Sequence, residues 1–205
     1  FDRVTKIAAD AKQLALVETF AQGNRVFVAG SSWGPDEDIF LRYFNEHPGW
    51  KLIIASHEVT EGRLTEIQSK FKGSCVRYTQ ANMDEVKEAD CLLIDCFGLL
   101  SSIYKYGEVA YVGGGFGVGV HNLLEAAVYG MPVFFGPNNK KFQEAAKLKE
   151  CGGGLEISSY EDFAEKMNRF AEDSAEIKKS GDAAGRYVAS NSGATQKLLR
   201  TLKLL

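Results

Sequence analysis

The residues best suited to binding an anion lie in one glycine-rich segment, residues 111–125, which reads YVGGGFGVGVHNLLE. Glycine has no Cβ atom, so the backbone N–H groups of this segment can approach a ligand closely. A helix predicted to begin just after the glycines would add unpaired N–H groups and a partial positive charge. This combination suits a phosphate or a carboxylate.

The same segment also has a purely structural interpretation. A strand that turns tightly into a helix uses glycine too, and Asn122 and Glu125 have the spacing of a capping box, in which two side chains satisfy backbone N–H groups. The number of glycines favours a ligand. Five glycines among residues 113–119 exceed the needs of a turn, and each costs about 0.5–1 kcal/mol of ordering entropy.

Two familiar nucleotide-binding patterns are missing. A P-loop requires a Gly-Lys pair, and the chain contains none. The dinucleotide pattern requires glycine at positions i, i+2 and i+5, but its third glycine would fall on Val118 or Val120. We therefore disfavour a P-loop NTPase and an ordinary NAD enzyme.

Residues of this kind act together only if a fold brings them together, and the hydrophobic runs predict a sheet. Short apolar segments alternate with amphipathic ones, which is typical of β-α-β units. We predict one α/β domain with a doubly wound, mostly parallel sheet of about six strands. The strand-like runs cover residues 25–30, 51–56, 75–78, 90–95, 108–112, 131–135 and 154–157. The helical patterns cover residues 3–20, 36–46, 64–71, 99–106, 122–130, 140–150 and the tail from residue 160.

Ligands of open parallel sheets bind beyond the carboxyl ends of the strands, so the residues just after each strand are the candidates. Ser31 and Ser32 come after the first strand and either hold phosphate oxygens or form a serine-rich turn. His57 comes after the second strand and is as readily structural as functional. Phe97 and Gly98 precede a short helix, where Phe97 either stacks on a base or packs in the core.

Composition excludes several classes of protein. The net charge of -3 provides no overall basic surface for nucleic acid. The four cysteines show no C-x-x-C spacing, so we expect no zinc site and no other metal or cofactor. No apolar run approaches the ~18 residues that a membrane span needs. We can assign no catalytic nucleophile and base, so the visible features bind a ligand without obviously reacting with it.

Four segments together resemble the C-terminal domain of the bacterial 3-deoxy-D-manno-octulosonic acid (Kdo) transferases. They are FDRV at the start, VAGSSW, DCFGLL, and YVGGGF followed by GVHNLLEAAVYGMPVFFGP. The last block is long and specific, with a Gly-Gly strand end, a Gly-His-Asn-x-Leu-Glu helix start and a Gly-Pro turn in order. The resemblance covers most of the chain.

The resemblance implies a Rossmann-like half of a two-domain GT-B glycosyltransferase. Such enzymes invert the anomeric carbon, need no metal, take CMP-Kdo as donor and use a lipid A precursor as acceptor. The donor-binding candidates are carried over by motif, with His57 matching the histidine of a Pro-Arg-His turn and Glu125 expected on the ribose hydroxyls. They are Ser31, Ser32, His57, Phe97, Gly98, Leu99, Gly114, Gly115, His121, Asn122 and Glu125.

The chain departs from the family at identifiable positions. Ala55 and Ser56 replace the Pro-Arg that precedes the histidine, so one cation is lost, and Leu99 replaces a glutamate. These differences indicate a divergent branch of the family.

The resemblance also predicts how the domains are organised. We expect residues 1–205 to be the donor-binding domain, with residues 1–22 as an entry helix and residues 160–205 as C-terminal helices. The acceptor domain, the general base and the membrane contact would belong to an N-terminal half outside this chain. The full protein would act in the cytoplasm, at the inner face of the bacterial inner membrane, without nucleic acid as a partner.

Two alternatives remain open. The first is a GT-B transferase or epimerase that uses a uridine sugar nucleotide. The second is a non-catalytic module that binds a nucleotide without a partner domain. In a transferase half, an apolar face that includes parts of residues 1–20 and 198–205 would meet the missing domain.

Overall fold

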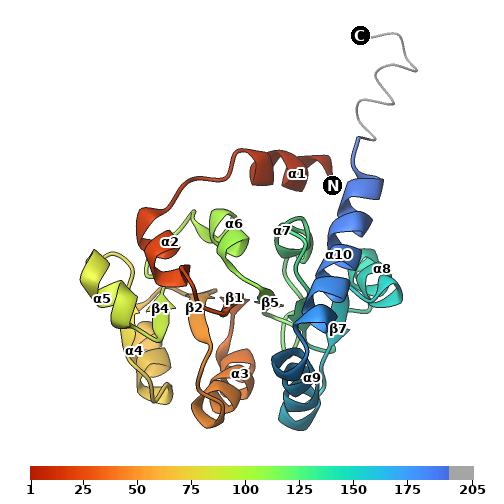
Figure 1. Ribbon diagram of the computed structural model, residues 1–205. Coiled ribbons are helices and arrows are strands. Elements are labelled where there is room, and N and C mark those ends of the chain that lie inside the picture. Colours follow the sequence, from red (N-terminus) through yellow and green to blue (C-terminus); the bar gives the residue numbers. More distant parts are fainter. Residues whose placement is uncertain (194–205) are drawn as a thin grey trace.

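A single parallel sheet forms the centre of the computed structural model, which describes residues 1–193 (Figure 1). Every strand pair is parallel, and the strand order is β3-β4-β2-β1-β5-β6-β7. The strands are β1 (Val26–Ser32), β2 (Lys51–Ser56), β3 (Cys75–Arg77), β4 (Cys91–Leu93), β5 (Val109–Val112), β6 (Val133–Phe135) and β7 (Gly154–Glu156). The predicted doubly wound α/β fold is confirmed, with seven strands where about six were expected.

Helices cover both faces of the sheet, which explains why the central strands are apolar on both sides. One face carries α3 (Gly34–Glu46), α4 (Glu61–Lys70) and α9 (Tyr160–Glu172). The other face carries α1 (Asp2–Ala9), α2 (Ala15–Ala21), α5 (Met83–Glu88), α6 (Leu100–Ile103), the 3-10 turn η1 (Tyr104–Tyr106), α7 (Leu124–Ala127), α8 (Gln143–Cys151) and α10 (Ser174–Asn191).

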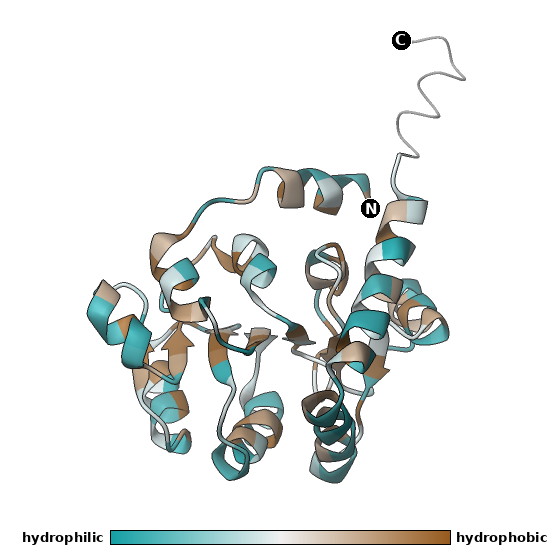
Figure 2. Cartoon of the chain, viewed as in Figure 1, coloured by the Kyte–Doolittle hydropathy of each residue, from teal (hydrophilic) through white to brown (hydrophobic). Residues whose placement is uncertain are grey.

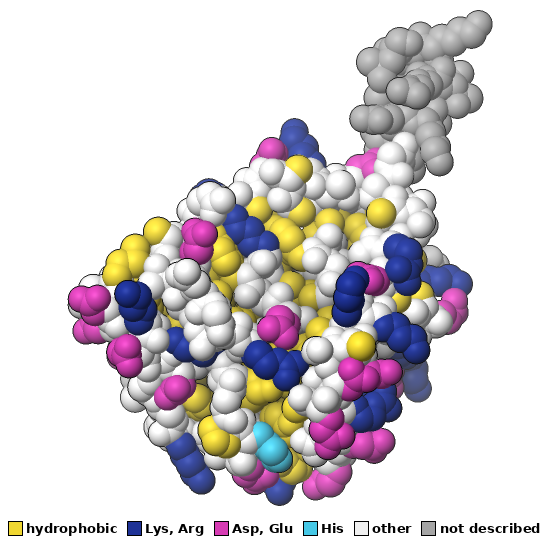
Figure 3. Space-filling view, in the orientation of Figure 1, with side chains coloured by type: hydrophobic (Ala, Val, Ile, Leu, Met, Phe, Trp, Pro, Cys, Tyr) yellow, Lys and Arg dark blue, Asp and Glu magenta, His cyan; other side chains and the backbone are white. Residues whose placement is uncertain are grey.

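Two hydrophobic cores result, one on each side of the sheet. Alternate residues of β1 enter different cores, with Val28 in one and Phe27 in the other. Figure 2 colours the strands mostly as hydrophobic residues, whereas the helices carry both hydrophobic and hydrophilic residues. Charged side chains of both signs are interspersed over the face drawn in Figure 3, where hydrophobic side chains gather below α1.

The single helix expected over residues 3–20 is wrong, because α1 and α2 are separate. Between them the chain changes direction and is held to the next layer, where the Lys12 N–H donates to the Ser102 hydroxyl at 3.0 Å. The Leu14 N–H likewise donates to the Tyr106 hydroxyl at 2.9 Å. These bonds stabilise a break that helical periodicity alone does not reveal.

No helix among the described residues is both long and apolar enough to cross a membrane. The predicted apolar segment at residues 198–205 lies outside the described residues.

Candidate functional site

Strand β1 ends in a bulge that separates the two candidate serines. Its register with β2 shifts between Gly30 and Ser32, and Ser31 has a φ of 52°, the only positive φ among the described residues other than glycine. Ser31 is half-buried at the carboxyl edge. Ser32 is buried, and its hydroxyl donates to Glu37 Oε1 at 2.9 Å. Ser31 is therefore the serine that remains open to a ligand.

Glu37 forms a buried ion pair beneath this turn. Its side chain is 0% exposed and accepts a hydrogen bond from the Arg63 guanidinium. Burial raises the pKa of Glu37, while Arg63 and Ser32 act in the opposite direction. Arg63 also pairs with Glu66. The positive charge of Arg63 is thus already paired with two carboxylates of the protein.

The carboxylate of Asp36 joins three segments of the chain through hydrogen bonds. The residue is 1% exposed. Its Oδ1 atom accepts from the Tyr111 hydroxyl at 2.7 Å, and its Oδ2 atom accepts from the Trp33 N–H at 2.9 Å and the Gly114 N–H at 3.0 Å. The end of β1, the start of α3 and the glycine-rich segment are therefore held at one place.

The glycine-rich segment is packed tightly against its neighbours. A Cβ atom on Gly113 would lie 2.2 Å from the Ser31 carbonyl oxygen, and one on Gly115 would lie 2.6 Å from the backbone of Gly136. Gly114 has a φ of 93°. These glycines are required by packing, so their number is weaker evidence for a ligand than the sequence suggested.

Many N–H groups of this segment already have partners. Those of Gly117 and Gly119 donate to the Gly114 carbonyl at 3.0 and 2.9 Å. That of His121 donates to the Gly113 carbonyl at 3.2 Å. The segment satisfies much of its own backbone, which leaves fewer N–H groups for an anion than expected.

The helix expected over residues 122–130 is present but shorter than predicted, since α7 covers only Leu124–Ala127. The capping box is only half formed. Asn122 Oδ1 accepts from the Leu124 N–H at 3.1 Å, but Glu125 Oε1 accepts from the side-chain amide of Asn122, also at 3.1 Å, and not from a backbone N–H. A four-residue helix provides little dipole, so any role of Glu125 must come from its side chain.

Three aromatic rings meet at the carboxyl edge between β1, β2 and β5. Trp33 and His57 are stacked with ring centroids 4.4 Å apart, and His57 and His121 are stacked at 4.6 Å. Trp33 Nε1–H donates to His121 Nε2 at 3.1 Å. Burial, with a smaller effect from His57, lowers the pKa of His121, and Asp36 opposes this. We call Trp33, His57 and His121 the ring stack.

The remaining candidates lie on neighbouring strands. Phe97, Gly98 and Leu99 come after β4, and Phe97 is 77% exposed, so packing in the core is not its role. Val118 is 76% exposed and Phe142 is also exposed; both belong to loops beyond β5 and β6. The carboxyl edge therefore presents apolar side chains to its surroundings.

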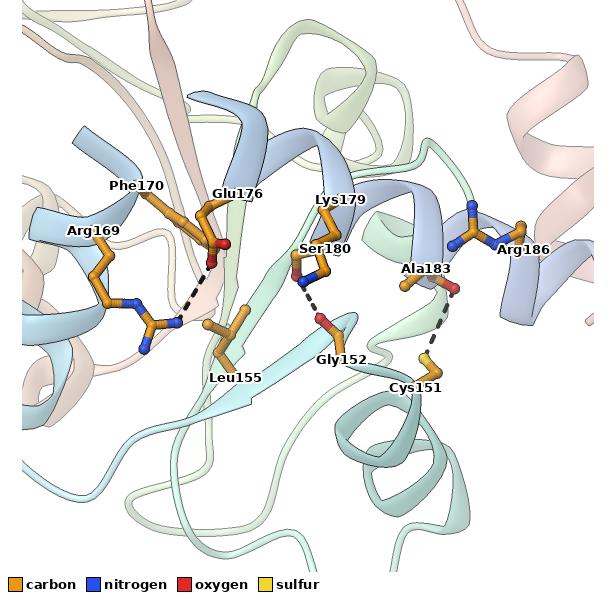
Figure 4. A pocket seen from close by; sticks show the side chains of 10 residues that line it. All are labelled: Cys151, Gly152, Leu155, Arg169, Phe170, Glu176, Lys179, Ser180, Ala183 and Arg186. Carbon is orange, nitrogen blue, oxygen red and sulfur yellow. Dashed lines mark hydrogen bonds and ion pairs between the residues drawn. The ribbon is translucent and has the colours of Figure 1, made fainter. Parts of the chain in front are cut away.

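Two cavities differ in their relation to this edge. One of about 290 Å³ is lined by His121 and Asn122 together with Phe142. The other, of about 270 Å³, lies between β7, α9 and α10 (Figure 4). There Arg169 pairs with Glu176, and the Ser180 hydroxyl donates to the Gly152 carbonyl at 2.6 Å. Its position at the amino end of β7 separates it from the candidate site.

Sequence reasoning did not identify Trp33 or Asp36 as central to the site. Both lie in the turn after the first strand, where position alone marks them as candidates. The fact that one carboxylate joins this turn to residues 111–114 depends on β1 and β5 being neighbours, which the residue pattern does not reveal.

Comparison with known proteins found no matching family model. The 3-deoxy-D-manno-octulosonic acid transferase of Aquifex aeolicus is 31% identical over 170 residues, which are 78% of this chain and 47% of that protein. The chain therefore spans about half the length of this curated relative.

Solved structures show the same fold. The C-terminal CMP-Kdo binding domain of WaaA from Acinetobacter baumannii is similar with a TM-score of 0.70 and 20% identity, over 91% of this chain and 98% of that one. Anabaena HepE, solved in complex with UDP-glucose, has a TM-score of 0.66 and 14% identity, over 100% of this chain and 56% of that one.

Proposed function

We propose that this chain, a relative of the C-terminal half of the Kdo transferases, is the donor-binding domain of a glycosyltransferase with a GT-B fold. The observation that carries the proposal is the meeting of the residues after β1, β2 and β5 at one sheet edge, in a chain 31% identical to such a transferase. Crevices at that edge are where open α/β sheets bind ligands.

The proposed donor is CMP-Kdo, which supplies a phosphate and a sugar carboxylate. Ser31 and the ring stack lie where an oxyanion would be held, and Asn122 and Glu125 lie on the adjoining segment. Phe97–Leu99 would contact the nucleotide. A base supplied by an N-terminal domain would deprotonate a hydroxyl of a lipid A precursor, which then attacks the anomeric carbon with inversion.

The proposal also covers the N-terminal partner domain and the location of the whole enzyme. The exposed apolar side chains of Phe97, Val118 and Phe142 would face the N-terminal domain across the donor. We place the whole enzyme at the inner face of the bacterial inner membrane, where that domain would provide the membrane contact.

Nucleotide titration tests whether the domain prefers a cytidine or a uridine nucleotide. We expect cytidine monophosphate to bind at least about tenfold more tightly than uridine monophosphate, because one mispaired buried polar group costs about 1–3 kcal/mol. Amide shifts at Gly98 and residues 113–122 would report the site. Tighter binding of the uridine nucleotide would favour the uridine-sugar alternative, and sub-micromolar binding by this chain alone would favour a non-catalytic module.

Replacement of Glu125 by alanine separates a ligand role from a capping role. Its carboxylate accepts one side-chain hydrogen bond and no backbone one, so we expect a loss of stability below about 1 kcal/mol. We expect nucleotide affinity to fall about tenfold if it holds the ribose hydroxyls. Calorimetry and thermal denaturation measure the two effects.

Glu150→Ala is the matched control, because Glu150 is an exposed glutamate that pairs with Lys147 on α8. It should change neither affinity nor stability appreciably. Unchanged affinity in Glu125→Ala, with a large loss of stability, would show that Glu125 serves the fold.

A further inference from the structure

The centre of the carboxyl edge has no fixed positive charge. The segments at the carboxyl ends of β1, β2 and β5 (residues 31–34, 57–60 and 113–122) contain no lysine or arginine. Arg63 is nearby, but its guanidinium is bonded to Glu37 and Glu66. An oxyanion bound there would meet a buried acidic pair, Asp36 and Glu37. In these segments only His57 and His121 can supply a positive charge near pH 7.

The two histidines of the ring stack are not equivalent. The Trp33 Nε1–H donates to His121 Nε2, and this bond exists only while that nitrogen carries no proton. Burial and the neighbouring His57 also disfavour a charged His121. His121 is therefore held neutral.

His57 is the ring that can carry the charge. It is exposed and is stacked on the indole of Trp33, with an interplanar angle of 22°. The face of an indole attracts a cation. His57 stacks on His121 at 4.6 Å, so two charged rings would repel each other, which further favours a neutral His121. Asp36 from α3 and Glu58, the next residue in the chain, are the nearby acids.

We propose that binding of a donor oxyanion draws one proton onto His57, with Trp33 supporting the charge and His121 remaining neutral. The inference rests on the proposed function, because the oxyanion is that of the sugar nucleotide. The protonated His57 ring would supply the positive charge that a lysine or an arginine could otherwise provide to the oxyanion. Affinity would then rise as the pH falls through the range in which free His57 is neutral and bound His57 is charged.

The test compares cytidine monophosphate binding to the whole chain and to His57→Gln, measured by calorimetry between about pH 6.5 and 8.5. We expect the variant to bind about tenfold more weakly than the parent chain at the low end and equally at the high end, as for one linked proton. The second ionisation of the phosphate, near pH 6, is common to both proteins and cancels in the ratio.

The other histidines provide controls. His47 stacks on Tyr43 at the C-terminal end of α3, the opposite end of that helix from Trp33, so His47→Gln should behave as the parent chain. His121→Gln should keep the pH dependence, since the His121 ring is uncharged both with and without the ligand. Because the chain has only three histidines, their ring signals can also be resolved by nuclear magnetic resonance.

A ratio of affinities that stays constant with pH both for cytidine monophosphate and for free 3-deoxy-D-manno-octulosonic acid, or a pH dependence lost in His121→Gln and kept in His57→Gln, would overturn the inference while leaving the proposed function intact. Absence of nucleotide binding at every pH would overturn both. Titration with free 3-deoxy-D-manno-octulosonic acid distinguishes the oxyanion, because proton uptake with this sugar would assign His57 to the carboxylate. Proton uptake with cytidine monophosphate but not with the free sugar would assign His57 to the phosphate.

Discussion

Replacing Asp36 by alanine should lower the free energy of unfolding by about 3–5 kcal/mol, because three donors would lose their acceptor in a buried place. Those donors are the Tyr111 hydroxyl and the N–H groups of Trp33 and Gly114. Without the carboxylate, the turn after β1 and the glycine-rich segment would no longer be held together. Nucleotide binding should therefore be lost along with stability, as chemical denaturation and calorimetry would show.

The neighbouring Asp38 is a matched control. It lies on the same helix but is exposed and pairs with Lys70 on the surface. Asp38→Ala should cost less than about 1 kcal/mol, as is usual for surface pairs. If both variants lose the same free energy of unfolding, the three hydrogen bonds of Asp36 contribute no more to stability than a surface ion pair.

Replacing Arg63 by glutamine should cost about 3–5 kcal/mol near pH 8, because a buried Glu37 would remain charged without its partner. Burial already raises the pKa of Glu37, and loss of Arg63 raises it further. A carboxyl group with a raised pKa binds its proton more tightly in the folded state than in the unfolded state. The stability of the variant should thus recover as the pH falls toward about 5, as urea denaturation at several pH values would reveal.

Arg169→Gln tests whether this behaviour requires burial. Arg169 pairs with Glu176 at 3.7 Å, and both side chains are exposed. This variant should lose less than about 1 kcal/mol, with little dependence on pH. A defect of Arg63→Gln that is the same at pH 5 and pH 8 would contradict an unpaired Glu37 charge as its cause.

Local patterns were sufficient to predict the sheet. The segment 51–56, with its apolar centre Leu52–Ala55, matches β2, because a strand covered on both faces has an apolar centre. The candidate residues lie at one edge of the sheet, since parallel strands place all their carboxyl ends together. The residues at the carboxyl end of each strand could therefore be identified from the amino-acid pattern alone.

The errors arose where tertiary contacts decide the outcome. The gap between α1 and α2 depends on bonds to Ser102 and Tyr106, which are about 90 residues away. The packing of Gly115 against Gly136 likewise depends on β6 lying beside β5 in the sheet. The burial of Ser32 reflects an acceptor, Glu37, whose own burial no local pattern indicates.

The strand order also has a consequence for synthesis of the chain. Strand β1 lies at the middle of the sheet, with β2 on one side and β5 on the other. Its second neighbour ends at Val112, so a ribosome must deliver more than half of the 205 residues before β1 is enclosed. Until then an apolar strand edge remains open to other chains. In a nascent chain, one edge of β1 would therefore stay unpaired from the synthesis of β2 until the synthesis of β5.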